Sequence, residues 1–208
     1  TDGGDTEASR DLFAMDTYMT VTAYGKGATE AVDQAADEIS RLDQLLSTGN
    51  EDSEIYKINQ SGDGILSEET AYLVERSLDL YEATDGAFDI AIYPVMKACG
   101  FTDDNFRVPD ADELKDLLTL TDASDISYDK ETSQIAFKKD GMQIDFGGIA
   151  KGYTSARIMD IFRACGIKSG LVNLGGNVQA LGTKKDGSSW RVAVQDPQDT
   201  DQYLGVLS

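Results

Sequence analysis

The sequence predicts an α+β fold, a layered α/β domain with a largely antiparallel sheet and flanking helices. Some segments repeat apolar residues at intervals of three and four, as amphipathic helices do, whereas others alternate apolar and polar residues, as half-buried strands do. Late in the chain, short alternating segments follow one another across glycine-rich turns, which favours antiparallel pairing. We expect a flexible acidic tail over residues 1–12 and a single domain over residues 13–208.

Helices are predicted from apolar periodicity and from residues that begin or end a helix. The stripe from Ala31 to Leu46 predicts a helix that ends near Ser47. Ser67 can cap a second helix, and Asp110 with Glu113 resembles the capping box of a short one. A further helix opens at Gly147–Gly148, and a glycine at position 166 can terminate it.

Alternating segments predict the strands. The first covers Thr17–Tyr24, and the later ones cover residues 126–128, 134–137, 142–146, 169–174, 177–181, 190–195 and 203–207. Asp140–Gly141 is a favoured pair for a tight turn, so we expect a hairpin that joins 134–137 to 142–146.

Composition excludes several classes of function. With 38 acidic and 18 basic residues, the chain has a net charge of −20, which opposes binding to nucleic acid, so we expect no nucleic-acid partner. Histidine is absent, which excludes Ser–His and Cys–His catalysis and leaves oxygen as the ligand for any metal. Cys99 and Cys165 are interpreted as small buried apolar residues, with a disulfide between them left open.

The start of the chain is polar and acidic. No stretch approaches the ~18 apolar residues that cross a bilayer, and there is no signal-peptide pattern. Residues 1–9 are compatible with a removed signal or with a lipid anchor upstream of residue 1, and equally with the end of an expressed fragment.

The segment Ile144–Tyr153 is the most informative part of the sequence. A strand delivers Asp145, two glycines allow the backbone to approach a ligand, and the following helix offers N–H groups and a positive end to a phosphate. Lys151 adds a point charge for a phosphoryl oxygen. The same pattern also fits an ordinary strand-to-helix turn with a solvated lysine.

Two other glycine-containing motifs have a similar double interpretation. Thr84–Asp89 forms a tight turn that can hold a flat ring and bond its edge, or it can be a simple helix C-cap. Val172–Asn177 places paired glycines between strands, which allows close approach to a ligand or makes a bulge or turn.

Together, in this order and spacing, the three motifs resemble the ApbE family of FAD:protein FMN transferases. Met15–Asp16–Thr17, the segment 46–59 and Trp190–Pro197 extend the resemblance to about residues 13–208. The fold expected from the resemblance is an ApbE-like layered α/β domain.

The resemblance implies an enzyme that uses Mg²⁺ to transfer FMN from FAD to a threonine or serine hydroxyl of a target flavoprotein. The product is a phosphoester, and AMP is released. The implied partner is a subunit or domain of an electron-transfer system. The implied location is extracytoplasmic, as a membrane-anchored lipoprotein of the periplasm or cell surface.

Site residues are carried over from the motifs. The expected FAD-binding residues are Met15, Ala87, Phe88, Asp89, Asp145 and Lys151. Asp145 and Lys151 are also the expected catalytic residues, and the carbonyl oxygen of Gly148 is the expected magnesium ligand.

The chain departs from the family pattern in two places. Gly49 stands where the family commonly has an aromatic residue that stacks on the flavin, and Tyr56 is a candidate substitute. The family's remaining magnesium ligands, an aspartate and a nearby threonine, lie in a C-terminal portion that has no counterpart here, so residues 13–208 are expected to form a domain that lacks this portion.

Other functions also fit the sequence. A metal-dependent FAD pyrophosphatase would use water as the acceptor, and a noncatalytic module would only bind FAD. A nicotinamide-binding fold fits less well, because Gly-Gly-x-x-x-Gly lacks the dinucleotide-binding spacing.

Overall fold

A computed structural model describes residues 6–208 and divides the chain into two compact units. Unit 1 combines the residues up to Arg41 with the residues from Lys151 onwards, and unit 2 runs from Leu42 to Ala150. The expectation of a single domain over residues 13–208 stays a prediction. The chain leaves unit 1 after its first helix begins and returns to it in a later helix.

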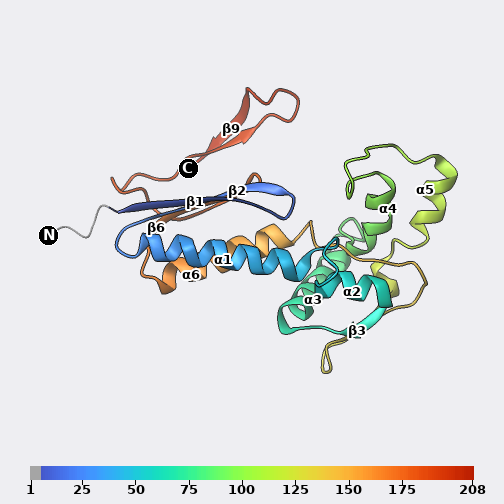
Figure 1. Ribbon diagram of the computed structural model, residues 1–208. Helices are drawn as coiled ribbons and strands as arrows, with labels where there is room; N and C mark the ends of the chain where they lie inside the picture. The colour runs from blue at the N-terminus through green and yellow to red at the C-terminus, as the bar shows by residue number, and fades with distance from the viewer. Residues whose placement is uncertain (1–5) are drawn as a thin grey trace. The chain divides into compact units, whose positions relative to one another are not determined.

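Unit 1 is built on a four-stranded antiparallel sheet in the order β1-β2-β6-β7. Figure 1 shows this sheet nearly edge-on, with β1, β2 and β6 labelled. The strands are β1 (Glu7–Ala14), β2 (Thr17–Tyr24), β6 (Ser169–Leu174) and β7 (Asn177–Gly182). Pairing of β2 with β6 sets Met19 opposite Leu174 and Val21 opposite Val172, and all four side chains are buried. One face of the sheet is thus apolar.

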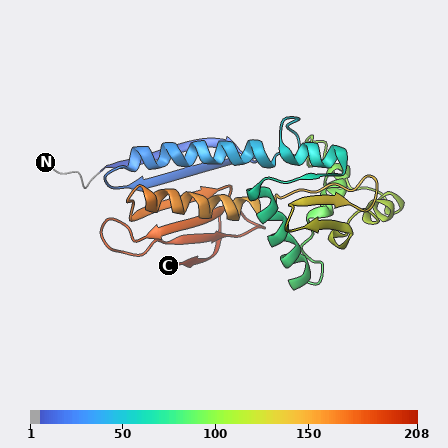
Figure 2. The ribbon, with the colours of Figure 1, turned by 90° about the horizontal axis from the view of Figure 1, so that it is seen from below.

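Two helices cover this face, α1 (Ala28–Leu46) and α6 (Ala150–Ala164), as the view in Figure 2 shows. Their apolar stripes supply the other half of the core, including Val32, Ile39, Ile158, Met159 and Phe162. Val32 and Ile39 lie two helical turns apart, and Phe162 follows Ile158 and Met159 at four and three residues, as the periodicity of an amphipathic helix predicts. The predicted end of α6 is confirmed, since Gly166 has φ +75° and Ile167 N–H donates to Phe162 O.

The strand β1 corrects the predicted tail. Residues 7–12 pair with β2 along their whole length, with Ala8 and Ala14 buried, so the tail prediction is wrong for them. Their polar residues lie at the sheet edge, where one face stays in solvent. Residues 1–5 of the predicted tail lie outside the described residues.

Unit 1 also contains a two-stranded ribbon, β8 (Val192–Gln195) with β9 (Tyr203–Leu207). The observed strand β8 therefore begins two residues later than the strand predicted over residues 190–195. Every residue of β9 is exposed, including Tyr203 and Leu204 at 66% each.

Unit 2 is a mixed α/β body with a three-stranded antiparallel sheet in the order β3-β5-β4. Its strands are β3 (Asp63–Ile65), β4 (Ile126–Asp129) and β5 (Gln134–Phe137). Its helices are α2 (Glu54–Ser61), α3 (Glu68–Ala83), η1 (Ile90–Ile92), α4 (Tyr93–Ala98), α5 (Ala111–Leu118) and η2 (Ala123–Asp125). Helix α2, capped by Ser53 through its hydroxyl, was not predicted.

The predicted strand over residues 142–146, and with it the hairpin at Asp140–Gly141, is wrong. The segment is extended and alternately buried at Met142, Ile144 and Phe146, but it joins no sheet. Its central peptide groups bond instead to a side chain, since Asn59 Nδ2 donates to Ile144 O at 2.8 Å and Ile144 N donates to Asn59 Oδ1 at 2.7 Å. Alternation of burial alone therefore could not distinguish a strand from an extended segment held by an amide.

Two remaining expectations concern the cysteines and membrane spans. Cys99 and Cys165 are unbridged and only half-buried, so the interpretation of both as buried residues is wrong in degree, although Cys165 packs against the core of unit 1. Over residues 6–208, none of the helices combines the length and the apolar character that crossing a bilayer requires.

Candidate functional site

In unit 1, a tight turn at the end of β1 brings two of the predicted site residues together. Met15 and Asp16 connect β1 to β2 with φ of 49° and 57°, the left-handed pair of a two-residue hairpin turn. Lys151 Nζ donates to Met15 O at 3.4 Å, and Thr154 Oγ1 lies 3.9 Å from Met15 Sδ. The first turn of α6 thus carries Lys151 and the buried Thr154 to the Met15 turn.

The turn between β6 and β7 lies at the same end of this sheet. Gly175 and Gly176 have φ of 62° and 92°, and Gly175 N–H donates to Tyr18 O at 3.1 Å. A Cβ on Gly175 would lie 2.4 Å from Thr17 Oγ1. The third predicted motif is therefore a hairpin turn packed against the start of β2.

In unit 2, the segment Thr84–Asp89 forms a corner after α3. Thr84 Oγ1 donates to Leu80 O at 2.7 Å and accepts from Phe88 N–H at 3.0 Å. Gly86, at φ 78°, donates to Tyr81 O at 2.8 Å. The C-cap interpretation is therefore correct for this motif, and the cap presents Ala87 as exposed and Phe88 as half-buried.

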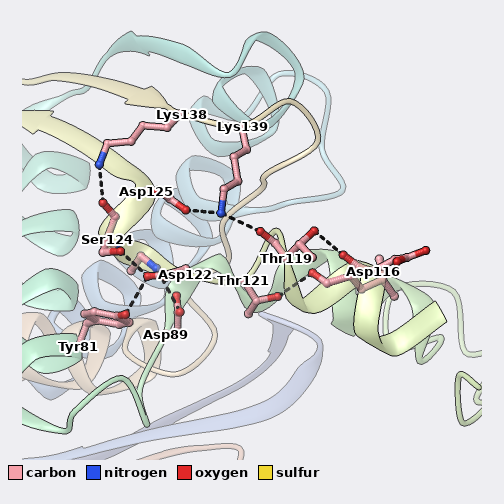
Figure 3. A network of polar contacts seen from close by, with 12 residues as sticks. Tyr81, Asp89, Asp116, Thr119, Thr121, Asp122, Ser124, Asp125, Lys138 and Lys139 are labelled. Atoms are coloured by element: carbon pink, nitrogen blue, oxygen red, sulfur yellow. Dashed lines mark hydrogen bonds and ion pairs between the residues drawn. The ribbon is translucent and has the colours of Figure 1, made fainter. Parts of the chain in front are cut away.

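The Asp89 carboxylate holds two chain segments. Oδ1 accepts from Ala91 N–H at 2.7 Å and Oδ2 accepts from Ala123 N–H at 3.2 Å. Next to it, Tyr81 OH donates to Asp122 Oδ1 at 2.8 Å, as Figure 3 shows. Burial raises the pKa of the Asp89 carboxyl, although both backbone donors act in the opposite direction. The side chain therefore fixes the corner whether or not it also contacts a ligand.

The glycine-rich bend before α6 packs against this corner. Asp145 N–H donates to Ile90 O at 2.9 Å, and a Cβ on Gly148 would lie 2.8 Å from Phe88 Cε2. The two most informative motifs, far apart in sequence, are thus adjacent within unit 2, and Gly147 and Gly148 are both exposed.

Several N–H groups of the bend are used internally. Gly147 N–H donates to Asp145 Oδ1 at 2.7 Å, and the N–H groups of Ile149 and Ala150 both donate to Phe146 O, at 2.9 and 2.8 Å. They are therefore not open to a phosphate in this conformation. The positive end of α6 and the Lys151 ammonium remain the sources of positive charge in this segment.

Asn59 is a residue of this region whose role the sequence did not indicate. It lies on the buried face of α2 with Ile55 and Ile58, and its amide bonds both backbone groups of Ile144, next to Asp145. The signal in the sequence is a polar residue in an otherwise apolar stripe, because a buried amide must find partners.

The structure thus groups the predicted residues by unit. Met15 and Lys151 lie together in unit 1, whereas Ala87, Phe88, Asp89, Asp145 and Gly148 lie together in unit 2. Gly49 is exposed, and a Cβ built on it meets nothing within 4 Å.

Two further features of the described residues bear on ligands. Residues 6–208 contain no group of three or more His, Cys, Asp or Glu side chains placed to hold a metal. A cavity of about 460 Å³ in unit 2 is lined by residues 59–63, 136–137 and 139–142. None of the predicted site residues lines this cavity. The candidate site is therefore the Gly147–Gly148 bend together with the Thr84–Asp89 corner, and neither of them lines the cavity.

Comparisons with known proteins agree with the motifs. Residues 15–208 match the model of the ApbE family. An FAD:protein FMN transferase of Treponema pallidum is 32% identical over 97% of this chain and 61% of its own length, and one of Escherichia coli is 27% identical over 88% and 54%. This chain spans about half to three-fifths of the length of the curated relatives it matches.

Solved structures show the same fold. A crystal structure of an ApbE protein from Thermotoga maritima has a TM-score of 0.89 and 27% identity, over 97% of this chain and 67% of that one. The flavin transferase ApbE of Vibrio cholerae has a TM-score of 0.85 at 22% identity, over 97% of this chain and 68% of that one. The predicted fold class is confirmed.

Proposed function

Because the chain belongs to the ApbE family, whose model matches residues 15–208, we propose that it acts in the transfer of FMN from FAD to a protein. The acceptor is a threonine or serine hydroxyl of a target flavoprotein, the product is a phosphoester, and AMP leaves. Relatives along most of this chain are named FAD:protein FMN transferase, which supports the proposal.

The observation that supports it most is the packing of the Gly147–Gly148 bend on the Thr84–Asp89 corner. If the bend had faced away from the corner, the motifs that carry the resemblance would not form one surface. Instead, Gly148 approaches the Phe88 ring so closely that a side chain would overlap it. In the proposal this surface binds the flavin half of FAD, with Ala87, Phe88 and Asp89 as its lining and Asp145 at its edge.

Lys151 and Met15 have separate roles in the proposal. The Lys151 ammonium neutralises phosphoryl oxygens of FAD during transfer, since catalysis of phosphoryl transfer is mainly positioning and electrostatic stabilisation. Lys151 Nζ contacts Met15 O in the free protein, which keeps the ammonium beside the residue proposed to touch the flavin. The net charge of −20 makes this local positive charge more necessary.

We propose that the reaction uses Mg²⁺, with the carbonyl oxygen of Gly148 as one ligand. The fit to the described residues is partial. A backbone oxygen on an exposed bend suits a hard cation, but residues 6–208 contain no cluster of three or more His, Cys, Asp or Glu side chains placed to hold a metal. The aspartate and threonine that the resemblance implies have no counterpart in the sequence. When bound, the ion would supply positive charge to the pyrophosphate.

The reaction is tested by mass spectrometry of a candidate acceptor flavoprotein after incubation with FAD, Mg²⁺ and the protein at its full natural length. Covalent addition of FMN supports the proposal. AMP release without any acceptor indicates a pyrophosphatase, and FAD binding without AMP release indicates a binding module.

Replacing Lys151 by alanine tests the phosphoryl role. We expect turnover to fall by about 100-fold or more, the usual effect of removing one group that stabilises transition-state charge. Lys168→Ala, at an exposed lysine of the same unit, is the matched control and should keep full turnover. Unchanged turnover of Lys151→Ala with normal FAD binding would remove Lys151 from the site.

Introducing an aromatic ring at position 49 tests where the flavin binds, because a stacked ring there should increase FAD affinity. The site around the glycine is open, and its φ is not in the left-handed region, so Gly49→Tyr should fold normally. A stacked ring contributes about 1 kcal/mol, so we expect FAD affinity to rise by about 5-fold, measured by flavin fluorescence. If Tyr56 already stacks on the flavin, Gly49→Tyr has no effect and Tyr56→Leu weakens binding instead.

We also propose that the natural protein is extracytoplasmic and held at the membrane by a lipid anchor upstream of residue 1. The resemblance supports this location. Labelling with a radioactive fatty acid in the natural host, followed by cell fractionation, should show a labelled protein in the membrane fraction. An unlabelled protein in the cytoplasm would contradict it.

A further inference from the structure

Residues 100–118 of unit 2, which we call the apolar lobe, expose an unusual amount of apolar surface. Phe101 and Phe106 are 62% and 65% exposed, and Val108 is 93% exposed. The lobe ends in α5, whose apolar stripe of Leu114, Leu117 and Leu118 includes no buried residue. Several large exposed apolar side chains in one short segment are typical of interaction sites in soluble proteins.

Specific contacts fix the conformation of the lobe. The Arg107 guanidinium donates to both carboxylate oxygens of Glu113, at 2.7 and 2.5 Å, and Arg107 N–H donates to Cys99 O at 3.1 Å. The rings of Phe101 and Phe106 meet edge to face with centroids 5.7 Å apart. The two aromatic side chains are thus held outward as a pair.

The C-terminal end of the lobe is anchored to the rest of unit 2. Lys139 Nζ donates to Thr119 O at 3.0 Å and pairs with Asp125 Oδ2 at 2.5 Å, as Figure 3 shows. At its other end, α4 and η1 connect the lobe to Asp89 of the corner, within the same unit. An occupant of the lobe would therefore be held at a defined place relative to the corner.

The charges around the lobe select the kind of occupant. The lobe has six acidic residues, Asp103, Asp104, Asp110, Asp112, Glu113 and Asp116, and two basic ones, Arg107 and Lys115. Like charges repel anionic lipid, nucleic acid and a second copy of the same lobe. Charge complementarity instead favours a protein that surrounds an apolar patch with lysine and arginine.

We propose that the apolar lobe is the docking surface for the acceptor flavoprotein, which presents an apolar patch ringed by basic side chains. This inference rests on the proposed function, because it identifies the occupant as the acceptor of FMN. Phe101 and Phe106 are the anchors, since large aromatic side chains contribute most of the affinity at protein interfaces. The acidic residues accelerate encounter and set the orientation.

The surface chemistry is tested first with a defined probe. The probe is a fluorescent 18-residue amphipathic helix with leucine on one face and lysine on the other, and a leucine–glutamate helix is the control peptide. We expect the leucine–lysine peptide to bind wild type, and the double variant Phe101→Ser/Phe106→Ser to bind it at least about tenfold more weakly by anisotropy. The variant Ile65→Ser/Tyr72→Ser removes exposed apolar side chains elsewhere in the unit and should bind like wild type.

Two outcomes of the peptide experiment would overturn the inference. Equal binding by wild type and both double variants would mean that the peptide recognises acidic surface in general. Self-association of wild type in sedimentation, lost in Phe101→Ser/Phe106→Ser, would mean that the lobe docks a second copy. All substituted residues are at least half exposed, so thermal unfolding should change little among the three proteins, and similar unfolding would exclude misfolding as the cause.

The claim that the lobe binds the acceptor is tested in the FMN-transfer assay, with an acceptor flavoprotein and the protein at its full natural length. We expect Phe101→Ser/Phe106→Ser to need about tenfold more acceptor for half-maximal transfer, with FAD affinity unchanged. Equal transfer by the variant would overturn the docking inference and leave the proposed function intact. Absence of transfer by wild type would count against the proposed function, and the peptide result would then decide whether the lobe docks proteins at all.

Discussion

The pair Gly147–Gly148 in unit 2 and the pair Gly175–Gly176 in unit 1 are identical in sequence and differ in structure. In the sequence, both follow a predicted strand and both indicate close approach of the backbone to a ligand. In the structure, Gly175 and Gly176 adopt left-handed φ values in a hairpin turn. Neither Gly147 nor Gly148 has a φ in that region.

Gly175 and Gly176 are therefore required by their backbone conformation, whereas Gly147 and Gly148 are required because there is no room for a side chain. The turn needs φ values that L-residues adopt at a cost of about 1–2 kcal/mol. At the bend, a Cβ on Gly147 would lie 2.7 Å from Asp145 Oδ1, and one on Gly148 would lie 2.8 Å from the Phe88 ring. The missing side chains at the bend allow it to pack on the surface proposed to bind FAD. The left-handed φ values at the turn allow β6 and β7 to form a hairpin.

Gly175→Ala should have the largest effect on stability, because both reasons act at this position. The alanine Cβ would meet Thr17 at 2.4 Å while φ stays at 62°. Strain of about 1–2 kcal/mol and steric overlap of about 1–3 kcal/mol should together lower the free energy of unfolding by about 2–5 kcal/mol, measured in urea.

The neighbouring Gly176→Ala is the matched control. Its φ of 92° imposes strain, but its Cβ would meet nothing within 4 Å, so a loss of only about 1–2 kcal/mol is expected. Equal losses at the two glycines would mean that Thr17 moves away freely, and the contrast between conformation and space would not hold within the turn.

Asn59→Asp tests how the bend is held in the absence of strand pairing. The introduced carboxylate can still accept from Ile144 N–H, but it places a negative oxygen against Ile144 O, where the amide now donates. Loss of that bond together with a buried charge should cost about 2–4 kcal/mol at neutral pH. Unfolding in urea at several pH values measures it.

The pH dependence of Asn59→Asp has a definite sign. Burial and the facing carbonyl raise the pKa of the introduced carboxyl above its unfolded value, so the folded state binds the proton more tightly. The penalty should therefore be smallest below the unfolded pKa and grow as pH rises through the folded pKa. Gln60→Glu, an exposed amide-to-acid change next to it, should show no such dependence. A penalty that does not vary with pH would mean that the carboxyl is not buried there.

The parts of the fold that the sequence predicted are those in which a local period matches one packing face. Strand β2 was predicted at its observed ends, since its buried Met19, Val21 and Ala23 alternate with less buried neighbours. The first helix was predicted for the same reason. The secondary-structure predictions failed where contacts between distant parts of the chain determine the local structure. Residues 142–146 alternate like a strand but pair with Asn59, and β1 is a polar edge strand that only its register with β2 reveals.

The sequence predicted which motifs make up the candidate site, but not how those motifs pack together or which of their groups are already hydrogen-bonded. The adjacency of Gly148 and Phe88 follows from no spacing, because 59 residues separate them, and only the family resemblance joined their motifs. The resemblance could not indicate that Asp89 is occupied by two backbone donors or that Gly147, Ile149 and Ala150 use their N–H groups internally. Those assignments depend on the folded backbone.

Gly148→Ala should have the smallest effect on stability and the clearest effect on the proposed function. The clash is with the far end of the Phe88 ring, which can rotate, so the cost in urea unfolding should be about 1 kcal/mol. A displaced ring no longer matches the flavin, and loss of an aromatic contact of about 0.5–1.5 kcal/mol should weaken FAD binding by about 2- to 10-fold.

Gly148→Ala then separates the two roles of paired glycines when it is compared with Gly175→Ala. Each protein is unfolded in urea and titrated with FAD from the same preparation. We expect Gly148→Ala to lose FAD affinity with little stability, because space at the bend serves the ligand surface. Gly175→Ala should mainly lose stability, because its turn connects two strands of the sheet. A Gly148→Ala protein that is as unstable as Gly175→Ala and binds FAD normally would assign Gly148 to the fold, and Phe88 would have to be removed from the proposed flavin surface.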